Sequence, residues 1–410
     1  MRSFVIEINT VVPGTDKRCD VFLDGKNMII TGVNGSGKTQ LIRHLHSYCQ
    51  RAIDEHHVSI ESIELETKNL EDWLKANSTT HPHRDIYENK VKENYDRIEI
   101  FKRPSARIGS ISRYAEDCKA GKAVLKFFEA TRQANIRSSA AVTTIEQIKG
   151  QSKGVDGAHL FEDYLVSRIT MQAYAESPLI GNDPLAAKNA AEWFKKLEGD
   201  LRNLFEDDSI GVIFDYKQQC FFIHQAQRAP FRFQNLSSGF SSVLAIYASL
   251  MMDVELQEVP PSEIYGIVFI DEVDAHLHVS LQRKILSFLT ESFPRIQFIT
   301  TTHSPFVVSS VSNALIYDLS TSQVVEDLSL YSYDSILSGL FHTPPVSKIV
   351  TAKLDCLYEE VDSDFPNFEK IKDILNSVRD GEDTLDPTSA MYVKRAKMIL
   401  KKYMGSLRNV

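Results

Sequence analysis

An α/β fold with a largely parallel sheet is predicted by three features of this sequence. Short apolar segments of the buried-strand type recur along the chain, and stretches with apolar residues at helical spacing stand between them. A glycine-rich loop lies between one such strand and one such helix. Two later apolar strands end directly in polar residues. Alternating strands and helices are typical of a parallel sheet that is covered by helices.

Length and composition are those of an ordinary globular protein. The chain has 410 residues, of which 43% are hydrophobic and 25% charged, and its net charge of −9 argues against a generally basic nucleic-acid-binding protein. No apolar run approaches the ~20 residues of a membrane span, and the N-terminus lacks the plan of a signal peptide. The five scattered cysteines form no C-x-x-C pair, so neither zinc nor a disulfide framework is indicated. We therefore expect a cytoplasmic protein.

The first third of the chain is expected to place helices between groups of strands. Residues 1–31 contain three strand segments, and a helix is predicted over 40–53. The polar residues at about 55–95 are predicted to be helical. Further strands are predicted at 96–103 and 122–132, on either side of a basic connection.

The rest of the chain continues the alternation. Helices are predicted over 159–176 and 185–205, followed by a hairpin, an apolar helix from 238, and two buried strands at 265–272 and 296–303 that a single helix joins. The final residues are mostly helical. We expect a core domain over 1–345 with insertions at about 50–95 and 156–206, and a helical segment over 346–410.

The stretch GVNGSGKT fits the pattern G-x-x-x-x-G-K-[ST] between a strand and a helix. Its glycines allow successive backbone N–H groups to curl around phosphates, and the helix N-terminus favours the same anion. The lysine is expected to reach the β- and γ-phosphates and the threonine to ligate Mg²⁺. The sequence thus predicts ATP and Mg²⁺ as ligands. The loop residues expected to bind them are Asn34, Gly35, Ser36, Gly37, Lys38 and Thr39.

Two later strands end in side chains that suit the same chemistry. The first ends in Asp271 and Glu272, and the next is followed by His303. In open α/β sheets the ligand lies at the carboxyl ends of the strands. We expect Asp271 to hold Mg²⁺, Glu272 to orient and deprotonate the attacking water, and His303 to contact the γ-phosphate.

The triplet Ser237, Ser238 and Gly239 stands directly before an apolar helix. One interpretation is helix capping, because serine is a favoured N-cap residue. The other is a helix start that binds a phosphate through its hydroxyl, its backbone N–H groups and its dipole.

Four motifs occur in a fixed order: the phosphate loop, LSSG at 236–239, the apolar run that ends in Asp-Glu, and TTTHSP. Together they resemble ABC-type ATPases of the branch that contains SMC proteins, RecF and the OLD-family ATPases. The resemblance covers roughly residues 1–50 and 210–320. It implies an ABC-type P-loop ATPase head with a mixed sheet, an antiparallel β lobe and helical insertions, plus a helical C-terminal tail.

The resemblance also assigns roles to residues. LSSG is the signature motif of the family, so Ser237, Ser238 and Gly239 would act in trans on ATP held by the other subunit of a head-to-tail dimer. Asp274 would lie near that dimer interface. The glutamine loop is poorly marked: Gln133 is the candidate, as a further Mg²⁺ ligand, and Arg132 is an equal alternative.

A compact chain of this type resembles the stand-alone ATPase subunits of the Septu and PARIS anti-phage systems. Its helical blocks are too short for a long SMC arm. The lone D-x-D, residues 362–364, is interpreted as a solvated helix end, so the chain is expected to have no nuclease site of its own.

The same resemblance implies a slow, switch-like ATPase that works with a separately encoded effector, such as a Toprim or HNH nuclease. DNA or a phage-derived molecule would be the trigger, and no membrane is involved. The alternative is a RecF-like DNA-binding ATPase of repair. Its best local basic residues are Lys102, Arg103, Arg107 and Arg113.

Overall fold

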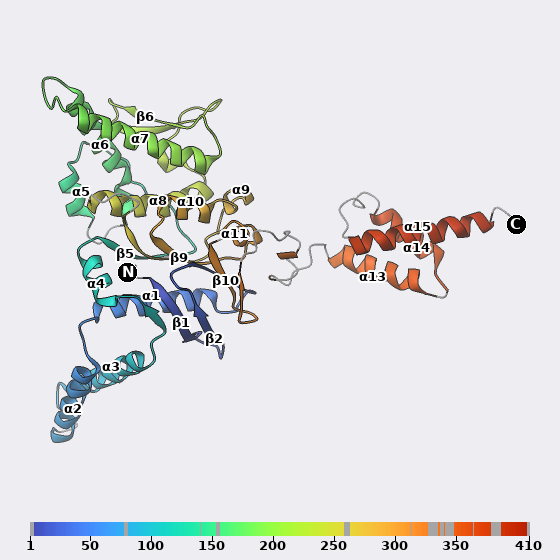
Figure 1. The fold of residues 1–410 in the computed structure, drawn as a ribbon, viewed down its shortest axis with the longest axis horizontal. Helices are drawn as coiled ribbons and strands as arrows, with labels where there is room; N and C mark the ends of the chain where they lie inside the picture. The colour runs from blue at the N-terminus through green and yellow to red at the C-terminus, as the bar shows by residue number, and fades with distance from the viewer. Residues whose placement is uncertain are drawn as a thin grey trace. The chain divides into compact units, whose positions relative to one another are not determined.

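The computed structural model divides the chain into two compact units, Met1–Tyr333 and Asp334–Val410 (Figure 1). The expected domain boundary after residue 345 stays a prediction. The structure describes residues 4–77, 81–139, 141–152, 156–257, 263–311, 313–326, 335–336, 340, 348–363, 365–378 and 387–407.

A six-stranded sheet forms the centre of the first unit. Its strand order is β11-β10-β3-β9-β8-β5, and every neighbouring pair is parallel except β10 with β11. The predicted α/β fold with a mixed sheet is therefore confirmed, although β10 and β11 had no counterpart among the predicted strands. The strands are β3 (Asn27–Thr31), β5 (Ala123–Phe128), β8 (Tyr265–Ile270), β9 (Ile296–Thr301), β10 (Ala314–Asp318) and β11 (Gln323–Glu326).

An antiparallel β lobe accompanies this sheet, as expected. It contains β1 (Val5–Val11), β2 (Arg18–Phe22) and β4 (Ala106–Ile108), with β1 in the middle. One apolar cluster joins the lobe and the main sheet to helix α1 (Lys38–Asp54). The helix contributes side chains at i, i+3 and i+4 spacing, which form one apolar stripe. These buried side chains are Leu41, Ile42, Leu45, Cys49 and Ile53.

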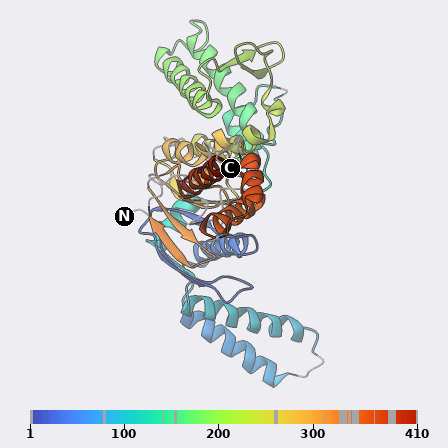
Figure 2. The same cartoon turned by 90° about the vertical axis from the view of Figure 1, so that its right-hand side faces the viewer.

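The first insertion is a helical hairpin of α2 (Ile60–Ala76) and α3 (Arg84–Lys102), at one end of the unit (Figures 1 and 2). The strand predicted at 96–103 is wrong, because these residues complete α3. Their polar–apolar alternation suggested a strand, but tertiary contacts favour the helix. Ile98 is buried, Arg97 pairs with Glu55, and the Lys102 ammonium lies 2.9 Å from the Glu64 carboxylate.

The predicted connection that follows contains β4 and the start of α4 (Ile111–Lys119), which leads into β5. The second insertion projects from the opposite end of the unit (Figure 2). It comprises α5 (Ile145–Gln151), α6 (Phe161–Glu176), α7 (Pro184–Phe205) and the expected hairpin of β6 (Gly211–Asp215) with β7 (Cys220–His224).

Helix α8 (Ser238–Gln257) connects this insertion to the main sheet and lies on the side opposite α1 (Figure 1). Tyr247 donates to Asp200 of α7 at 2.6 Å, and Trp193 of α7 donates to Glu255 at 2.6 Å. By length and composition α8 is the one helix among the described residues that could cross a membrane. No apolar run of that length was expected from the sequence. However, 72% of that window is buried, as befits a core helix.

The segment between β8 and β9 differs from prediction in one respect. A single helix was expected over 279–293, whereas two short helices form, α9 (Val279–Gln282) and α10 (Ile285–Ser292). A further short helix, α11 (Pro305–Val308), begins at a proline after β9, a favoured first position.

The second unit contains α13 (Lys348–Asp362), α14 (Phe368–Val378) and α15 (Pro387–Leu407) around its own apolar core. This matches the expected helical tail. Asp362 lies at the end of α13, where its carboxylate accepts hydrogen bonds from Tyr392 and Arg395. The helix-end interpretation is thus confirmed for Asp362, while Asp364 lies outside the described residues.

Candidate nucleotide-binding site

The phosphate loop connects the end of β3 to the start of α1 in a conformation that requires glycine. Gly32, Gly35 and Gly37 have φ angles of 140°, 78° and 99°, a region that side chains rarely adopt. A Cβ on Gly37 would also lie 2.7 Å from the Val12 side chain in the β1–β2 turn, whereas Gly35 faces open space. The loop is therefore packed on one side and free on the other.

Lys38 is buried beneath this loop. Its ammonium donates to the carbonyl oxygens of Gly32 at 2.9 Å and Val33 at 3.1 Å. Burial lowers the pKa of Lys38, and nearby carboxylates oppose that shift because they favour the charged form. Those carboxylates belong to Glu272, Asp271, Asp274 and Asp318.

Asp271 lies at the end of β8 and is 1% exposed. One of its oxygens accepts from the hydroxyl of Thr39 at 3.2 Å and from that of Thr301, at the end of β9, at 2.6 Å. The carboxylate and the Thr39 hydroxyl, both predicted Mg²⁺ ligands, are thus adjacent. The same Thr301 hydroxyl accepts from the N–H of Glu272 at 2.7 Å.

Glu272 itself has φ of 44°, which is uncommon for a residue other than glycine. It is half-buried, as is Asp274 in the turn that follows. Asp274 accepts a hydrogen bond from Thr302. The turn from Asp271 to Asp274 is therefore attached to the end of β9 through Thr301 and Thr302.

His303 follows Thr302 on the same strand end. Its pKa is lowered first by burial and then by the Lys38 charge, while Asp274, Glu272 and Asp271 act in the opposite direction. The imidazole is thus close enough to Lys38 and to the acidic turn for their charges to act on it. The ring is consequently neutral at pH 7, with one nitrogen able to donate and the other to accept.

The segment after β5 supplies both glutamine-loop candidates. Gln133 is exposed and its side chain makes no hydrogen bond within the described part of the chain. Arg132, in contrast, is buried and its guanidinium donates to the carbonyl oxygens of Asp271, Glu272 and Val273 at 2.9, 3.2 and 3.0 Å. The geometry distinguishes the two residues: one contacts the acidic turn and the other faces solvent.

The start of α8 differs from these regions. The helix begins at Ser238, and its first turn is closed by the Ser241 N–H on the Ser237 carbonyl. The side chains of Ser237 and Ser238 are exposed, and within the described residues neither of their hydroxyls has a partner. Gly239 is buried, and a Cβ there would lie 3.0 Å from the carbonyl oxygen of His276, two residues after the acidic turn. A larger residue at this position would have to shift that carbonyl by a few tenths of an ångström.

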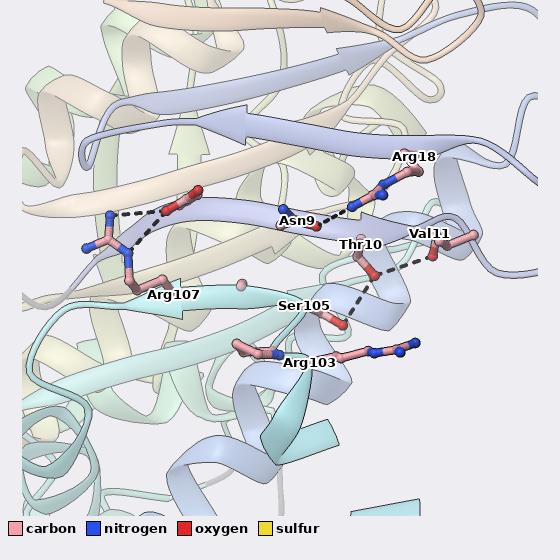
Figure 3. Close-up of a pocket in the computed structure, with 10 residues that line it drawn as sticks. Asn9, Thr10, Val11, Arg18, Arg103, Ser105 and Arg107 are labelled. Atoms are coloured by element: carbon pink, nitrogen blue, oxygen red, sulfur yellow. Dashed lines mark hydrogen bonds and ion pairs between the residues drawn. The ribbon is translucent and has the colours of Figure 1, made fainter. Parts of the chain in front are cut away.

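A cavity of about 770 Å³ lies beside the β lobe (Figure 3). Its walls include Arg18, Arg103 and Arg107, and its floor carries the hydrogen-bonded hydroxyls of Thr10 and Ser105. Lys102, Arg107 and Arg113 pair with Glu64, Glu7 and Asp117. Of the four basic residues named for DNA, only Arg103 lacks a carboxylate partner in the described chain. Three of these four basic side chains therefore have a carboxylate beside them.

The residues present fit a nucleotide with its magnesium ion. The Ser36 hydroxyl in the loop is buried without a partner in the described chain, and Gly35 leaves space above it. Among the described residues no three His, Cys, Asp or Glu side chains could hold a metal alone. Thr39 and Asp271 would thus be completed by phosphate and water oxygens, the ligands that Mg²⁺ prefers.

Two supporting residues were absent from the sequence prediction. Thr301 hydrogen-bonds both acidic residues, although it stands within the quoted TTTHSP. The Ser320 hydroxyl after β10 accepts from the N–H of Val33 at 2.8 Å. Thr301 was detectable as a hydroxyl at a strand end, whereas Ser320 depended on the unpredicted strand β10.

The chain is similar to several known proteins. Residues 148–309 match the family described as "AAA domain, putative AbiEii toxin, Type IV TA system". The "Retron Ec83 probable ATPase" of Escherichia coli is 41% identical over 91 residues, which are 22% of this chain and 17% of that protein. Septu protein PtuA of Bacillus thuringiensis is 23% identical over 332 residues, 76% of this chain and 73% of PtuA. This chain thus spans less than a fifth of the retron relative.

Among solved structures, a crystal structure of the SMC head bound to the C-winged helix domain of ScpA aligns over 80% of this chain and 99% of that one, with 13% identity and a TM-score of 0.37. Over part of its length the chain is thus similar to a family of AAA domains, to a probable retron ATPase and to a Septu PtuA protein, and its phosphate loop follows the P-loop pattern between a strand and a helix.

Proposed function

We propose that this chain binds ATP and Mg²⁺ between two of its copies, hydrolyses the ATP slowly, and uses this cycle to control a separately encoded effector in cytoplasmic anti-phage defence. One observation carries the proposal. Lys38, the Asp271–Glu272 pair and His303 converge at one edge of the sheet, whereas Ser237 and Ser238 are exposed at the start of another helix.

The residues at the sheet edge divide the chemistry among them. Lys38, with the backbone N–H groups from Asn34 to Gly37, would bind the phosphates, and Thr39 and Asp271 would hold Mg²⁺. The metal, when bound, neutralises charge that develops on the phosphates. Glu272 would orient the attacking water and accept its proton, and His303 would donate to the γ-phosphate. Gln133 remains a candidate for a further metal contact.

The exposed helix start supports the dimeric part of the proposal. Within the described residues the Ser237 hydroxyl has no partner, and the first N–H groups of α8 are donors that suit an anion. A second copy would bring its own phosphates to them, with Asp274 near the junction. ATP binding would then stabilise the dimer, because only the liganded state makes these contacts.

The effector is proposed from the relatives. Similarity to Septu PtuA and to the retron ATPase supports a role beside a partner protein, for which a Toprim or HNH nuclease has suitable chemistry. DNA or a phage-derived molecule would be the trigger. The repair alternative receives no support from the four basic residues, because three of them are paired.

A mixing experiment tests the shared site. Lys38→Ala chains should neither bind nor hydrolyse ATP, and Ser237→Ala chains should bind ATP but hydrolyse it at least about tenfold more slowly, since a donor to the transition state is lost. Mixing the two should restore turnover, because each mixed dimer retains one intact composite site. Lys126→Ala, which removes a lysine paired with Asp253 away from the site, is the control for Lys38→Ala.

The measurement is phosphate release at fixed total protein over a range of mixing ratios. Recovery should be greatest at equal amounts, at a fraction of the wild-type rate. Activity that merely averages the two variants would contradict trans completion.

A further inference from the structure

The segment after β5 holds a buried cation that the ATPase chemistry does not directly require. Arg132 is 9% exposed and has no carboxylate within salt-bridge distance among the described residues. Its guanidinium instead donates to five carbonyl oxygens, two in its own loop and three in the acidic turn. Burial lowers its pKa to about 10, so the side chain stays charged at pH 7.

Burying a charge is costly unless its hydrogen bonds are made, so this arrangement requires compensation. The planar fork of arginine can bond several carbonyls at once, which a lysine ammonium cannot reproduce. The three acceptors in the turn are consecutive: Asp271, Glu272 and Val273. Arg132 therefore fixes the path of the main chain where the proposed catalytic glutamate stands.

The backbone conformation of Glu272 depends on such hydrogen bonds. Its φ of 44° is a strained conformation, which persists only where neighbours hold it. The Thr301 hydroxyl holds its N–H and Arg132 holds its carbonyl oxygen. Two side chains, one at the end of β9 and one in the loop after β5, thus set the direction in which the Glu272 carboxylate leaves the backbone.

The same segment is attached to α8. The N–H of Ala134 donates to the hydroxyl of Ser241 at 3.0 Å, in the first turn of that helix. The Gln234 amide, just before α8, donates to the carbonyl of Ile136 at 3.2 Å. A short stretch of chain therefore touches both the Glu272 turn and the helix that begins with Ser238.

We propose that Arg132 is a positioning residue for hydrolysis: its guanidinium clamps the main chain of Asp271–Val273, orients Glu272 and links that orientation to the start of α8. This inference rests on the proposed hydrolytic function. It adds a residue whose guanidinium bonds main-chain carbonyl oxygens and acts through Glu272.

Two substitutions test the clamp. Arg132→Lys keeps the charge but loses the fork, and Arg132→Ala removes both. For each, kcat should fall about ten- to a hundredfold, the loss expected when a reacting group is misplaced by about 1 Å. KM and the affinity for a fluorescent ATP analogue should stay within about threefold, because the phosphate loop is untouched. Millimolar guanidinium should partly restore kcat to Arg132→Ala and leave Arg132→Lys unchanged.

Arg137→Ala is the matched control. It removes an arginine of the same segment that pairs with Asp163 and donates to Gln151 at 2.8 Å, away from the acidic turn. A merely structural role predicts equal losses of kcat for Arg132→Ala and Arg137→Ala at equal losses of stability, and this would overturn the proposal. Full activity of Arg132→Lys would overturn it as well.

Hydrogen exchange separates failure of the clamp from failure of the proposed function. Peptides that cover 271–278 should exchange faster in both Arg132 variants and at the wild-type rate in Arg137→Ala. Unchanged exchange overturns the clamp even where wild type hydrolyses ATP. A wild-type chain without ATPase activity overturns the proposed function and the hydrolytic role of Arg132 with it.

Discussion

The buried edge of the sheet and the start of α8 differ in burial and in how their polar side chains are hydrogen-bonded. At the sheet edge, Asp271 accepts from Thr301, Lys38 donates to two carbonyl oxygens of the phosphate loop, and all three side chains are buried. At the start of α8, the Ser237 and Ser238 side chains face solvent without partners in the described chain. One region is preorganised by its own fold, whereas the other presents donors that need an outside ligand. Substitutions in the two regions should therefore differ in kind.

The largest effect is expected at the buried edge, for Glu272→Gln. The amide cannot accept a proton, so turnover should fall by about a hundredfold or more while ATP binding persists. If the exposed helix start then engages ATP of a second copy, the variant should form a stable dimer in ATP, measured by light scattering after size exclusion. Glu64→Gln, which alters a surface ion pair on α2, should behave as wild type. Normal turnover of Glu272→Gln would refute the assignment of the base.

A stability measurement sharpens the comparison. Thr301→Val removes a hydroxyl that donates to Asp271 and accepts from the Glu272 N–H, which should cost about 1–3 kcal/mol of the free energy of unfolding. Ser237→Ala, at an exposed position, should stay within about 0.5 kcal/mol of wild type. Urea unfolding measures both. Equal losses would mean that the two regions do not differ in the way described.

The smallest effect is expected from a change of pH on the free energy of unfolding. Burial lowers the pKa of His44, His46 and His303, all in or near the sheet edge and α1. As pH falls below about 6.5, the unfolded chain binds these protons first, so the free energy of unfolding should decrease toward the lowered folded-state pKa values. His46 packs against Phe127 and Phe269, and His46→Leu should remove part of this slope between pH 7.5 and 5.5. Parallel slopes for both proteins would contradict the assignment.

The sequence predicted the residues of the candidate site better than the residues that hold them in place. The phosphate loop, the Asp-Glu strand end and His303 follow apolar strands, and parallel strands bring such ends together whatever lies between them. The structure gathers these residues accordingly. Roles in trans, and the role of Gln133, depend on a second copy or a ligand and stay predictions.

Local pattern failed where tertiary contacts decide. Residues 96–103 alternate like a strand, yet Ile98 and the ion pair of Lys102 attach them to the α2–α3 hairpin. Strands β10 and β11 went unpredicted, and with them Ser320 beside the phosphate loop. Arg132 was named only as an alternative because nothing in its neighbourhood indicates that its partners lie about 140 residues further along the chain.

The chain has two tryptophans, one in each insertion, so its intrinsic fluorescence can be assigned to defined positions. Trp193 bonds Glu255 near the far end of α8, and the Arg168 guanidinium lies 4.6 Å from its ring centre. Trp73 instead packs in the hairpin against Tyr87. With Trp73 replaced by phenylalanine, a single emitter remains at the α7–α8 junction. A change in its emission wavelength or intensity on addition of nucleotide would then report movement of that helix in real time, without a dye.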